Sequence, residues 1–172
     1  MNIYIKTSYS QGSASITYSF YKTNLSLRFT KWVGTNSVGL SEYDKTGALS
    51  TTISDESAAA LYCIAKKIIA GKVKNPVLLE IPCNNDTKII FEYYPEQAVL
   101  TIEKQGDRIL FDFPCHIHKE KENGKTVEKI IWSGLIVFAM VLETYLSSVA
   151  ADRQTSEMLE GDYSNSYSSS GW

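Results

Sequence analysis

The stretch that decides the fold is residues 14–30, ASITYSFYKTNLSLRFT. Apolar and polar side chains alternate on both sides of the short polar segment 22–24, as they do in two half-buried strands joined by a turn. Leu27 and Phe29, for example, fall on the apolar side of the alternation, and Arg28 between them falls on the polar side. The stretch therefore predicts an antiparallel hairpin with one face in a core and the other in solvent.

Working outward from this hairpin, a run of strands followed by a helix occurs twice, in residues 13–71 and 76–151. The first run predicts strands 14–21, 25–32, 38–43 and 48–53, with a turn at 44–47, and a helix from an N-cap at Ser54 to Gly71. The second predicts strands 77–81, 87–94, 98–104 and 108–118, a charged segment 119–129 around Asn123-Gly124, and a helix capped by Ser133. The charged segment is either a protruding β-ribbon or a mobile loop. This order predicts an α+β chain of type β4-α-β4-α, with two antiparallel four-stranded sheets and two helices.

Length and composition suit one domain, residues 1–151, followed by a flexible acidic and Ser-rich tail, residues 152–172. The chain carries a net charge of −2, of which the tail holds four acids and one base, so the body is left at +1. Three cysteines without a CxxC pair suit a reducing compartment. The start of the chain has no signal-peptide pattern, and the apolar run between Lys129 and Glu143 is too short for a membrane span. We therefore expect a soluble, cytoplasmic protein with no membrane partner.

No sequence pattern of an enzyme or of a cofactor site is present, since the chain lacks a Walker loop, GxGxxG, GxSxG and HExxH. The two histidines, His116 and His118, share one face of a predicted strand, and Cys115 points away. A metal site would need Asp or Glu ligands from elsewhere in the chain. We expect an exposed strand end here, no metal, no cofactor and no catalytic residue.

Aromatic and cationic side chains fall together on the polar faces of the predicted strands. Rings that stack bases and cations that contact phosphates are what single-stranded nucleic acid needs from a sheet surface. With 11 tyrosines in the chain, chance exposure is the alternative explanation. The predicted nucleic-acid-binding residues are Tyr21, Arg28, Trp32, Tyr43, Lys45, Lys88, Tyr94, Lys104 and Arg108.

The second predicted helix is apolar on nearly every side. Leu135, Phe138 and Leu142 follow one face, and the predicted oligomer interface, Ile136, Val137 and Met140, follows another. A helix that is apolar all round is buried all round, so we expect the second face to pack on another subunit of a homodimer or homotetramer. A deep wedge within one chain would give the same pattern.

Three segments resemble the Whirly family of single-stranded-DNA-binding proteins in order and character. They are residues 25–30, LSLRFT, the Tyr43-Asp44-Lys45 stretch, and residues 49–53, LSTTI, running into a helix. In the second half, residues 99–102, VLTI, and 111–114, FDFP, precede the apolar helix in the same way. The resemblance extends to positive-cofactor-four-like proteins, which include single-stranded-DNA-binding proteins of phages.

This resemblance implies single-stranded DNA binding with little sequence specificity, in replication, recombination or repair, and self-association through helices. The Lys-Gly-Lys-Ala-Ala-Leu stretch of plant Whirly proteins is absent, and residues 15–19, SITYS, stand in its place. A phage or bacterial relative is therefore expected. Two alternatives on the same fold are a structural or adaptor protein that binds protein, and an RNA-binding protein.

The predicted tail ends in an aromatic residue after several acids, and Asp162 and Trp172 are the predicted partner-binding residues. Such a segment buries too little apolar surface to fold alone. It resembles the C-terminal tails of bacterial and phage single-stranded-DNA-binding proteins, which recruit replication proteins and compete with DNA. An inert solubilising tail is the alternative. If the resemblance holds, removing residues 157–172 tightens DNA binding.

Overall fold

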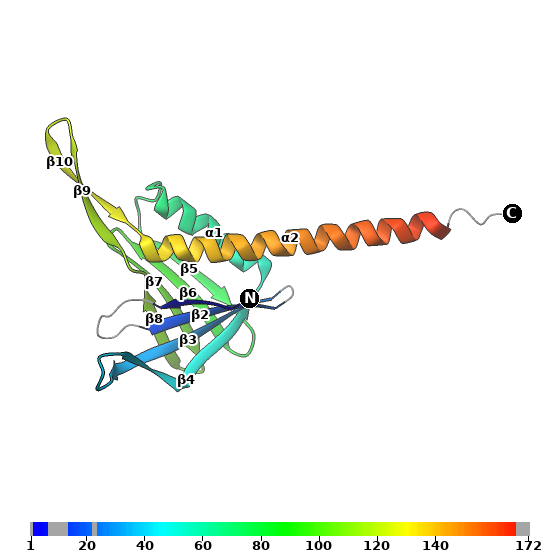
Figure 1. The fold of residues 1–172 in the computed structure, drawn as a ribbon, viewed down its shortest axis with the longest axis horizontal. Coiled ribbons are helices and arrows are strands. Elements are labelled where there is room, and N and C mark those ends of the chain that lie inside the picture. The colour runs from blue at the N-terminus through cyan, green and yellow to red at the C-terminus, as the bar shows by residue number, and fades with distance from the viewer. Residues whose placement is uncertain (1, 7–13, 22–23, 168–172) are drawn as a thin grey trace.

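The computed structural model describes the backbone of residues 2–6, 14–21 and 24–167, and the side chains of residues 14–20 and 24–156. Within these residues the chain forms ten strands and two helices, in the order β1 to β4, α1, β5 to β10, α2 (Figure 1). All the described strand pairs are antiparallel, which together with the two helices confirms the predicted α+β class. The predicted strand plan, in contrast, is wrong in three places.

The first sheet has the order β1-β2-β3-β4, with bounds Asn2–Lys6, Ala14–Tyr21, Asn24–Thr35 and Ser41–Ile53. Strands β2 and β3 form the predicted hairpin, with Tyr18 opposite Leu27. The edge strand β1 is not among the predicted strands. The predicted strands 38–43 and 48–53 are wrong as two elements, because both belong to the single strand β4.

The predicted turn at 44–47 is a bulge inside β4. Opposite Thr30 of β3, strand β4 has the four residues 45–48, so the register shifts across them. The Asp44 carboxylate accepts hydrogen bonds from the backbone N–H groups of Thr46 and Gly47, each at 3.0 Å. This local bonding is typical of a turn. The chain does not reverse, because β3 is long enough to pair with β4 on both sides of the bulge.

The second sheet has the order β5-β6-β7-β8, with bounds Val77–Pro82, Thr87–Tyr94, Gln97–Lys104 and Asp107–Asp112. The first three strands agree with the prediction to within one residue at each end. The fourth prediction, 108–118, is wrong in its second half, because β8 ends at Asp112 and the next strand begins at His116. Pro114, which cannot donate to a sheet ladder, lies in the break between them.

Strands β9, His116–Glu122, and β10, Lys125–Ile131, form a separate two-stranded ribbon. Figure 1 shows this ribbon protruding from one end of the molecule. Asn123 and Gly124 both have positive φ, 50° and 78°, as the tightest hairpin turns require. Of the two interpretations of this charged segment, the structure confirms the ribbon.

Helix α1, Asp55–Ile69, begins and ends where the sequence predicts. The Ser54 hydroxyl accepts the backbone N–H of Ser57 at 3.2 Å, which confirms the predicted N-cap. Gly71, with φ 67°, follows the last turn. The helix buries Ala58, Leu61, Ala65 and Ile68 in the core.

Helix α2, Ser133–Tyr167, packs against residues of both sheets. The Phe138 ring is 5.8 Å from the Tyr18 ring of the first sheet. The same ring is 5.2 Å from Phe113, which follows the second sheet. One face of α2 is thus a wedge inside a single chain, as the alternative interpretation of its apolar sequence allows. Ser133 is not an N-cap, since Trp132 O accepts the first helical bond and the Ser133 hydroxyl donates to Pro114 O.

The backbone of the predicted flexible tail is helical as far as it is described, because α2 continues to Tyr167. In Figure 1 this part of α2 projects beyond the sheets. The sequence loses apolar periodicity after Arg153, which removes packing, but residues 157–160, EMLE, are good helix formers that extend an existing helix. Trp172 lies outside the described residues.

One stretch of α2, Ser133–Ser156, is long and apolar enough, by length and composition alone, to cross a membrane. The prediction from sequence ended this apolar run at Glu143 and so made it too short. In the fold, 44% of its most apolar 18-residue window is buried. Leu135, Phe138 and Leu142 of this stretch belong to the core that the two sheets share, as in the core helix of a globular domain.

Candidate nucleic-acid interface

The outer face of the first sheet is built almost wholly from small hydroxyl side chains. Alternation along β2, β3 and β4 sends Ile16, Leu27 and Phe29 into the core and their neighbours outward. On the described part of this face lie Arg28 and seven hydroxyl residues, which we call the hydroxyl face: Ser15, Thr17, Ser19, Ser26, Thr30, Ser50 and Thr52. Arg28 stands opposite Thr17 on one side and Ser50 on the other. None of these eight positions carries a carboxylate, so a phosphate chain would meet no like charge on this face.

At one end, the hydroxyl face opens into a groove of about 760 Å³. Its lining combines two cationic, one acidic, one aromatic and one apolar side chain with the hydroxyls, and consists of Ser15, Thr17, Arg28, Thr30, Val33, Ser41, Glu42, Tyr43 and Lys45. The Arg28 guanidinium donates to the Lys45 carbonyl at 3.2 Å, which ties β3 to the bulge of β4. The structure thus brings three predicted residues, Arg28, Tyr43 and Lys45, to one site.

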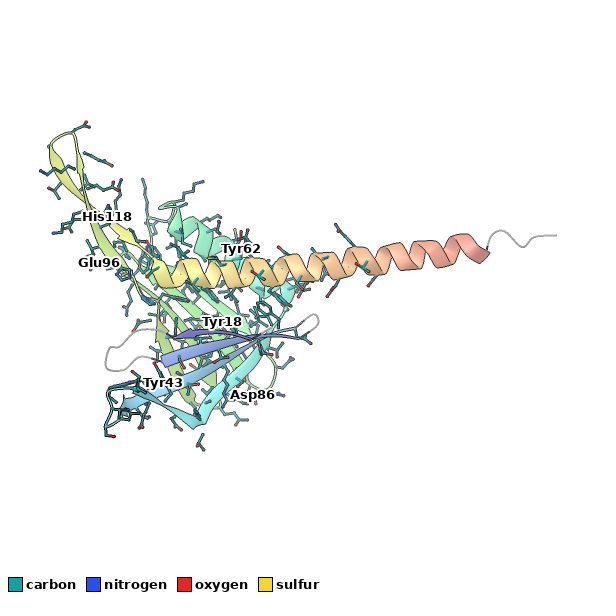
Figure 2. The ribbon with its side chains drawn as sticks, viewed as in Figure 1. Tyr18, Tyr43, Tyr62, Asp86, Glu96 and His118 are labelled. Atoms are coloured by element: carbon teal, nitrogen blue, oxygen red, sulfur yellow. The ribbon has the colours of Figure 1, made fainter. Side chains whose placement is uncertain are left out.

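The β4 bulge positions two of these side chains. Asp44 is occupied by its two backbone hydrogen bonds within the bulge, so its carboxylate is held in the turn-like segment. Lys45 is exposed at the edge of the groove, and Tyr43 is half-buried just before the bulge. Figure 2 shows Tyr43 at the end of the first sheet away from the point where α2 leaves the fold. The misassigned turn is therefore a part of the candidate site.

The opposite end of the hydroxyl face meets the second sheet. A smaller cavity of about 250 Å³ is lined there by Ser26, Ser50, Thr51, Thr52, Asn84, Asn85, Thr87 and Lys104. Lys104, a predicted binding residue at the end of β7, thus lies beside the hydroxyls of β3 and β4. The distance along β3 from Ser26 to Val33 is about 23 Å at the rise of an extended strand. The polar surface between the two cavities is long enough for several nucleotides.

The other predicted cations of the second sheet are not part of this surface. Lys88 and Arg108 lie on its outer face, where both approach the Glu103 carboxylate, at 3.4 Å and 3.8 Å. By strand alternation that face also carries Glu80, Glu92 and Asp112, so its acids outnumber its bases. Tyr94 is 48% exposed at the end of β6 on the same face. Lys88, Tyr94 and Arg108 are therefore poorly placed for a phosphate chain.

Two predicted aromatics flank the hydroxyl face. Trp32 of β3 is half-buried and stands opposite Tyr43 in the register of the sheet. Tyr21 ends β2, and its side chain lies outside the described residues. The prediction overlooked the hydroxyl residues, although the same alternation that identified Arg28 also places Thr17, Ser26 and Ser50 beside it.

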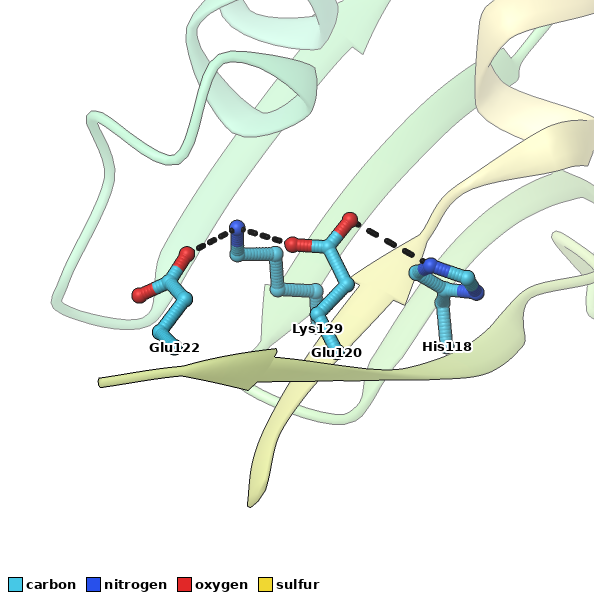
Figure 3. A network of polar contacts seen from close by, with 4 residues as sticks. All are labelled: His118, Glu120, Glu122 and Lys129. Atoms are coloured by element: carbon cyan, nitrogen blue, oxygen red, sulfur yellow. Dashed lines mark hydrogen bonds and ion pairs between the residues drawn. The ribbon is translucent and has the colours of Figure 1, made fainter. Parts of the chain in front are cut away.

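Part of the ribbon's charge forms a network of ion pairs across β9 and β10. The Lys129 ammonium lies 2.6 Å from Glu120 and 2.8 Å from Glu122, and His118 Nε2 lies 3.3 Å from Glu120 (Figure 3). The hydrogen bond and charge of Lys129 lower the pKa of Glu120, and the two carboxylates raise the pKa of Lys129. Among the side chains of residues 14–20 and 24–156, no three His, Cys, Asp or Glu groups come together as a metal site would need.

The predicted oligomer interface is partly exposed. Met140 is 60% and Val137 39% exposed on α2, and Ile136 is half-buried. The backbone of Asp162 lies in the projecting part of α2, and its side chain is not described.

Comparisons of the chain with models of protein families, with curated proteins and with solved structures gave no match. The resemblance to the Whirly family therefore stays a prediction.

Proposed function

We propose that the chain binds single-stranded nucleic acid across the hydroxyl face and the groove at its end. The observation that carries the proposal is the composition of this surface: Arg28 in a field of hydroxyls, with Tyr43 and Lys45 at the groove. Hydroxyls and a guanidinium donate hydrogen bonds to phosphate oxygens, and an aromatic ring stacks on bases of any identity. Such a surface gives binding with little sequence preference.

The proposal keeps the finer features expected from the Whirly resemblance. These are a β4-α-β4-α arrangement of Whirly type, a role in replication, recombination or repair, and a phage or bacterial type of protein in the cytoplasm. They also include self-association through Ile136, Val137 and Met140, and recruitment of replication proteins by the segment with Asp162 and Trp172. The partial exposure of Met140 supports the self-association. No catalytic role is proposed for any residue.

Paired substitutions on the two sheets test the proposed surface. The variant Arg28→Ala/Tyr43→Ala removes one cation and one ring from the groove, and Arg108→Ala/Tyr94→Ala removes the same residue types from the second sheet. Because stacking alone contributes about 1–3 kcal/mol per base, the first variant should bind fluorescent oligo-dT at least about 10-fold more weakly. The second should bind within about twofold of the parent protein, since Arg108 is neutralised by Glu103.

The proposal fails if the parent protein binds neither oligo-dT nor oligo-U at low salt, or if only the second variant loses affinity. Oligo-dT and oligo-U of equal length separate a DNA-binding from an RNA-binding protein. Binding should weaken as salt rises, because phosphate contacts release counterions.

A second candidate function, protein binding by an adaptor, is favoured by the outer face of the second sheet. Leu78 and Leu110 are 64% and 46% exposed there, beside the nearly buried Ile90 and Val99. An apolar centre with an acidic rim suits a protein surface and repels a phosphate chain. Leu78→Lys with Leu110→Lys should abolish binding of such a partner and leave oligo-dT affinity unchanged.

A further inference from the structure

The cations that form no ion pair gather in two regions of the described chain. Lys88, Arg108, Lys119, Lys129 and Arg153 each lie against a carboxylate. Of the other described cations, Arg28, Lys31 and Lys45 lie on β3 and β4, in or near the candidate interface. Four more follow one another at the end of α1, and we call them the lysine cluster: Lys66, Lys67, Lys72 and Lys74. The remaining three, Lys104, Lys121 and Lys125, are isolated from this cluster.

The lysine cluster surrounds a shallow groove on the exposed side of α1. The groove has a volume of about 470 Å³ and is lined by Tyr62, Cys63, Lys66, Lys67, Ala70 and Lys72. All four lysines are exposed, and no acid occurs between Glu56 and Glu80 in the sequence. Within the described side chains, none of the four lysines forms an ion pair. One acid from another element, Glu143 of α2, approaches the groove at Tyr62. The four lysines outnumber it, so the groove concentrates positive charge in a chain whose net charge is negative.

An aromatic ring lies in the same groove. The Lys66 ammonium is 5.9 Å from the centre of the Tyr62 ring. The Tyr62 side chain is half-buried, and burial together with Glu143 of α2 raises the pKa of its hydroxyl. A half-buried ring beside several cations is the arrangement that stacks a base while the cations hold its phosphates.

A purely structural explanation covers only half of the cluster. Lys66 and Lys67 lie in the last turn of α1, where cations stabilise the negative end of the helix dipole. Lys72 and Lys74 lie beyond the end of the helix, in a segment that packs Val73 against the core. The dipole falls off within the last turn and leaves these two charges unexplained.

We propose that the lysine cluster with Tyr62 is a second contact surface for the phosphate backbone of single-stranded nucleic acid. The inference rests on the proposed function of the hydroxyl face. Figure 2 shows Tyr62 and Tyr43 on opposite sides of α2, so a strand bound in one groove does not fill the other. A long strand then contacts the protein at two separate places, and a short one at a single place.

The chain's own acidic segment is a poor occupant for this groove. α1 and α2 run antiparallel, since Arg153 contacts Asp55 at the start of α1 whereas Trp132 lines a cavity with Ala70 and Gly71 at its end. Residues 157–162 lie about 36–44 Å along the helix axis from Ser133, away from the lysines. Only the acidic segment of another copy could reach the cluster.

The test compares two double variants against labelled oligo-dT of two lengths, about 8 and about 40 nucleotides. Lys66→Ala/Lys72→Ala removes two charges from the cluster, and Lys121→Ala/Lys125→Ala removes the same charge from the ribbon. We expect the first variant to bind the long oligomer about 10-fold more weakly, with a salt dependence reduced by about 1.4 in log–log slope. Its affinity for the short oligomer, and both affinities of the ribbon variant, should stay within about twofold.

If the two variants weaken binding of the long oligomer equally, the effect of the cluster comes from the net charge of the protein and not from a local site. This result would overturn the proposal. A loss of short-oligomer binding in the cluster variant, with no loss in Arg28→Ala/Tyr43→Ala, would instead overturn the hydroxyl face as the primary site. Unchanged long-oligomer binding in the cluster variant would also overturn the proposal. If light scattering without DNA then shows a smaller assembly in this variant and after deletion of residues 157–172, the lysine cluster binds the acidic segment of another copy.

Discussion

At the scale of single residues, Gly134 lies against Pro114 so closely that no side chain fits between them. The Gly134 N–H donates to the Pro114 carbonyl at 2.9 Å. A Cβ at position 134 would lie 2.3 Å from Pro114 Cδ and 2.8 Å from its backbone nitrogen. Because neither the ring nor the backbone can yield without shifting α2, only glycine fits here.

We expect Gly134→Ala to lower the free energy of unfolding by about 1–3 kcal/mol, the usual range for overpacking. Chemical denaturation monitored by tryptophan fluorescence measures this, since Trp132 is nearby and buried. Ser147→Ala on the exposed side of α2 is the matched control and should stay within about 0.5 kcal/mol. Equal stability of the two variants would show that the Pro114 contact relaxes freely.

The Glu120–Lys129 pair predicts a pH dependence of the ribbon. Because Lys129 lowers the pKa of Glu120, the contact stabilises the ribbon above the ordinary Glu pKa of about 4.3 and is lost as the pH falls through the lower folded value. A two-stranded ribbon is marginal on its own, so we expect the amides of β9 and β10 to lose exchange protection between about pH 5 and 3. Hydrogen exchange of β6 and β7 in the same samples is the internal control.

The Lys129→Met variant separates this effect from general acid unfolding. Its ribbon should be less protected at pH 7 and change little on acidification, because Glu120 has lost the cation that lowers its pKa. A ribbon that stays protected at about pH 3 in the parent protein would contradict the prediction.

At the scale of elements, α2 has two large apolar side chains exposed in the single chain, Val137 and Met140. Replacing Met140 with Asp places a charge on a side chain that is 60% exposed in the single chain, so the fold should tolerate it. If that side packs on another subunit, the buried charge should dissociate the assembly or leave it insoluble. Light scattering measures the outcome, with Ala59→Asp on the exposed side of α1 as the control. A folded Met140→Asp protein of unchanged size would show that this side faces solvent.

The elements differ in how far sequence could predict them, for physical reasons. The alternation of apolar and polar residues predicts β2 and β3 because each strand has one face in the core and one outside. The Ser54 cap predicts the start of α1. The β4 bulge contains the hydrogen bonds of a turn, so only its partner strand reveals that the chain continues. For the same reason Lys88 was predicted as a free cation: its neutralising partner, Glu103, comes from the adjacent strand.

At the scale of the whole molecule, the acidic segment and the candidate groove lie at opposite ends. Arg153 contacts Asp55, just after the end of β4, and Tyr43 lies about 23 Å back along the sheet, since Ile53 and Tyr43 pair with Leu25 and Trp32 of β3. The acids at 157–162 continue along α2 away from both. This separation exceeds the Debye length of about 10 Å at 0.1 M salt.

Deletion of residues 157–172 should therefore leave the fold intact and change oligo-dT affinity by less than about twofold at 0.1 M salt. This differs from the tighter binding that the sequence alone suggests. Fluorescence anisotropy checks it, with Glu157→Gln/Glu160→Gln/Asp162→Asn as a variant that removes charge and keeps the chain length. Tenfold tighter binding in both variants would show that the segment reaches the groove.

The contact at Pro114 also closes a loop in the chain path. The backbone leaves the second sheet at Pro114, builds the entire ribbon, and returns to the same point at Gly134, where a hydrogen bond joins the two ends. Since its two strands pair only with each other in the described part of the chain, the ribbon is attached to the domain at a single place, where its two ends lie side by side. It could be shortened, exchanged for another hairpin or fitted with a fluorophore at its tip, while the sheets and α2 beneath keep their connections.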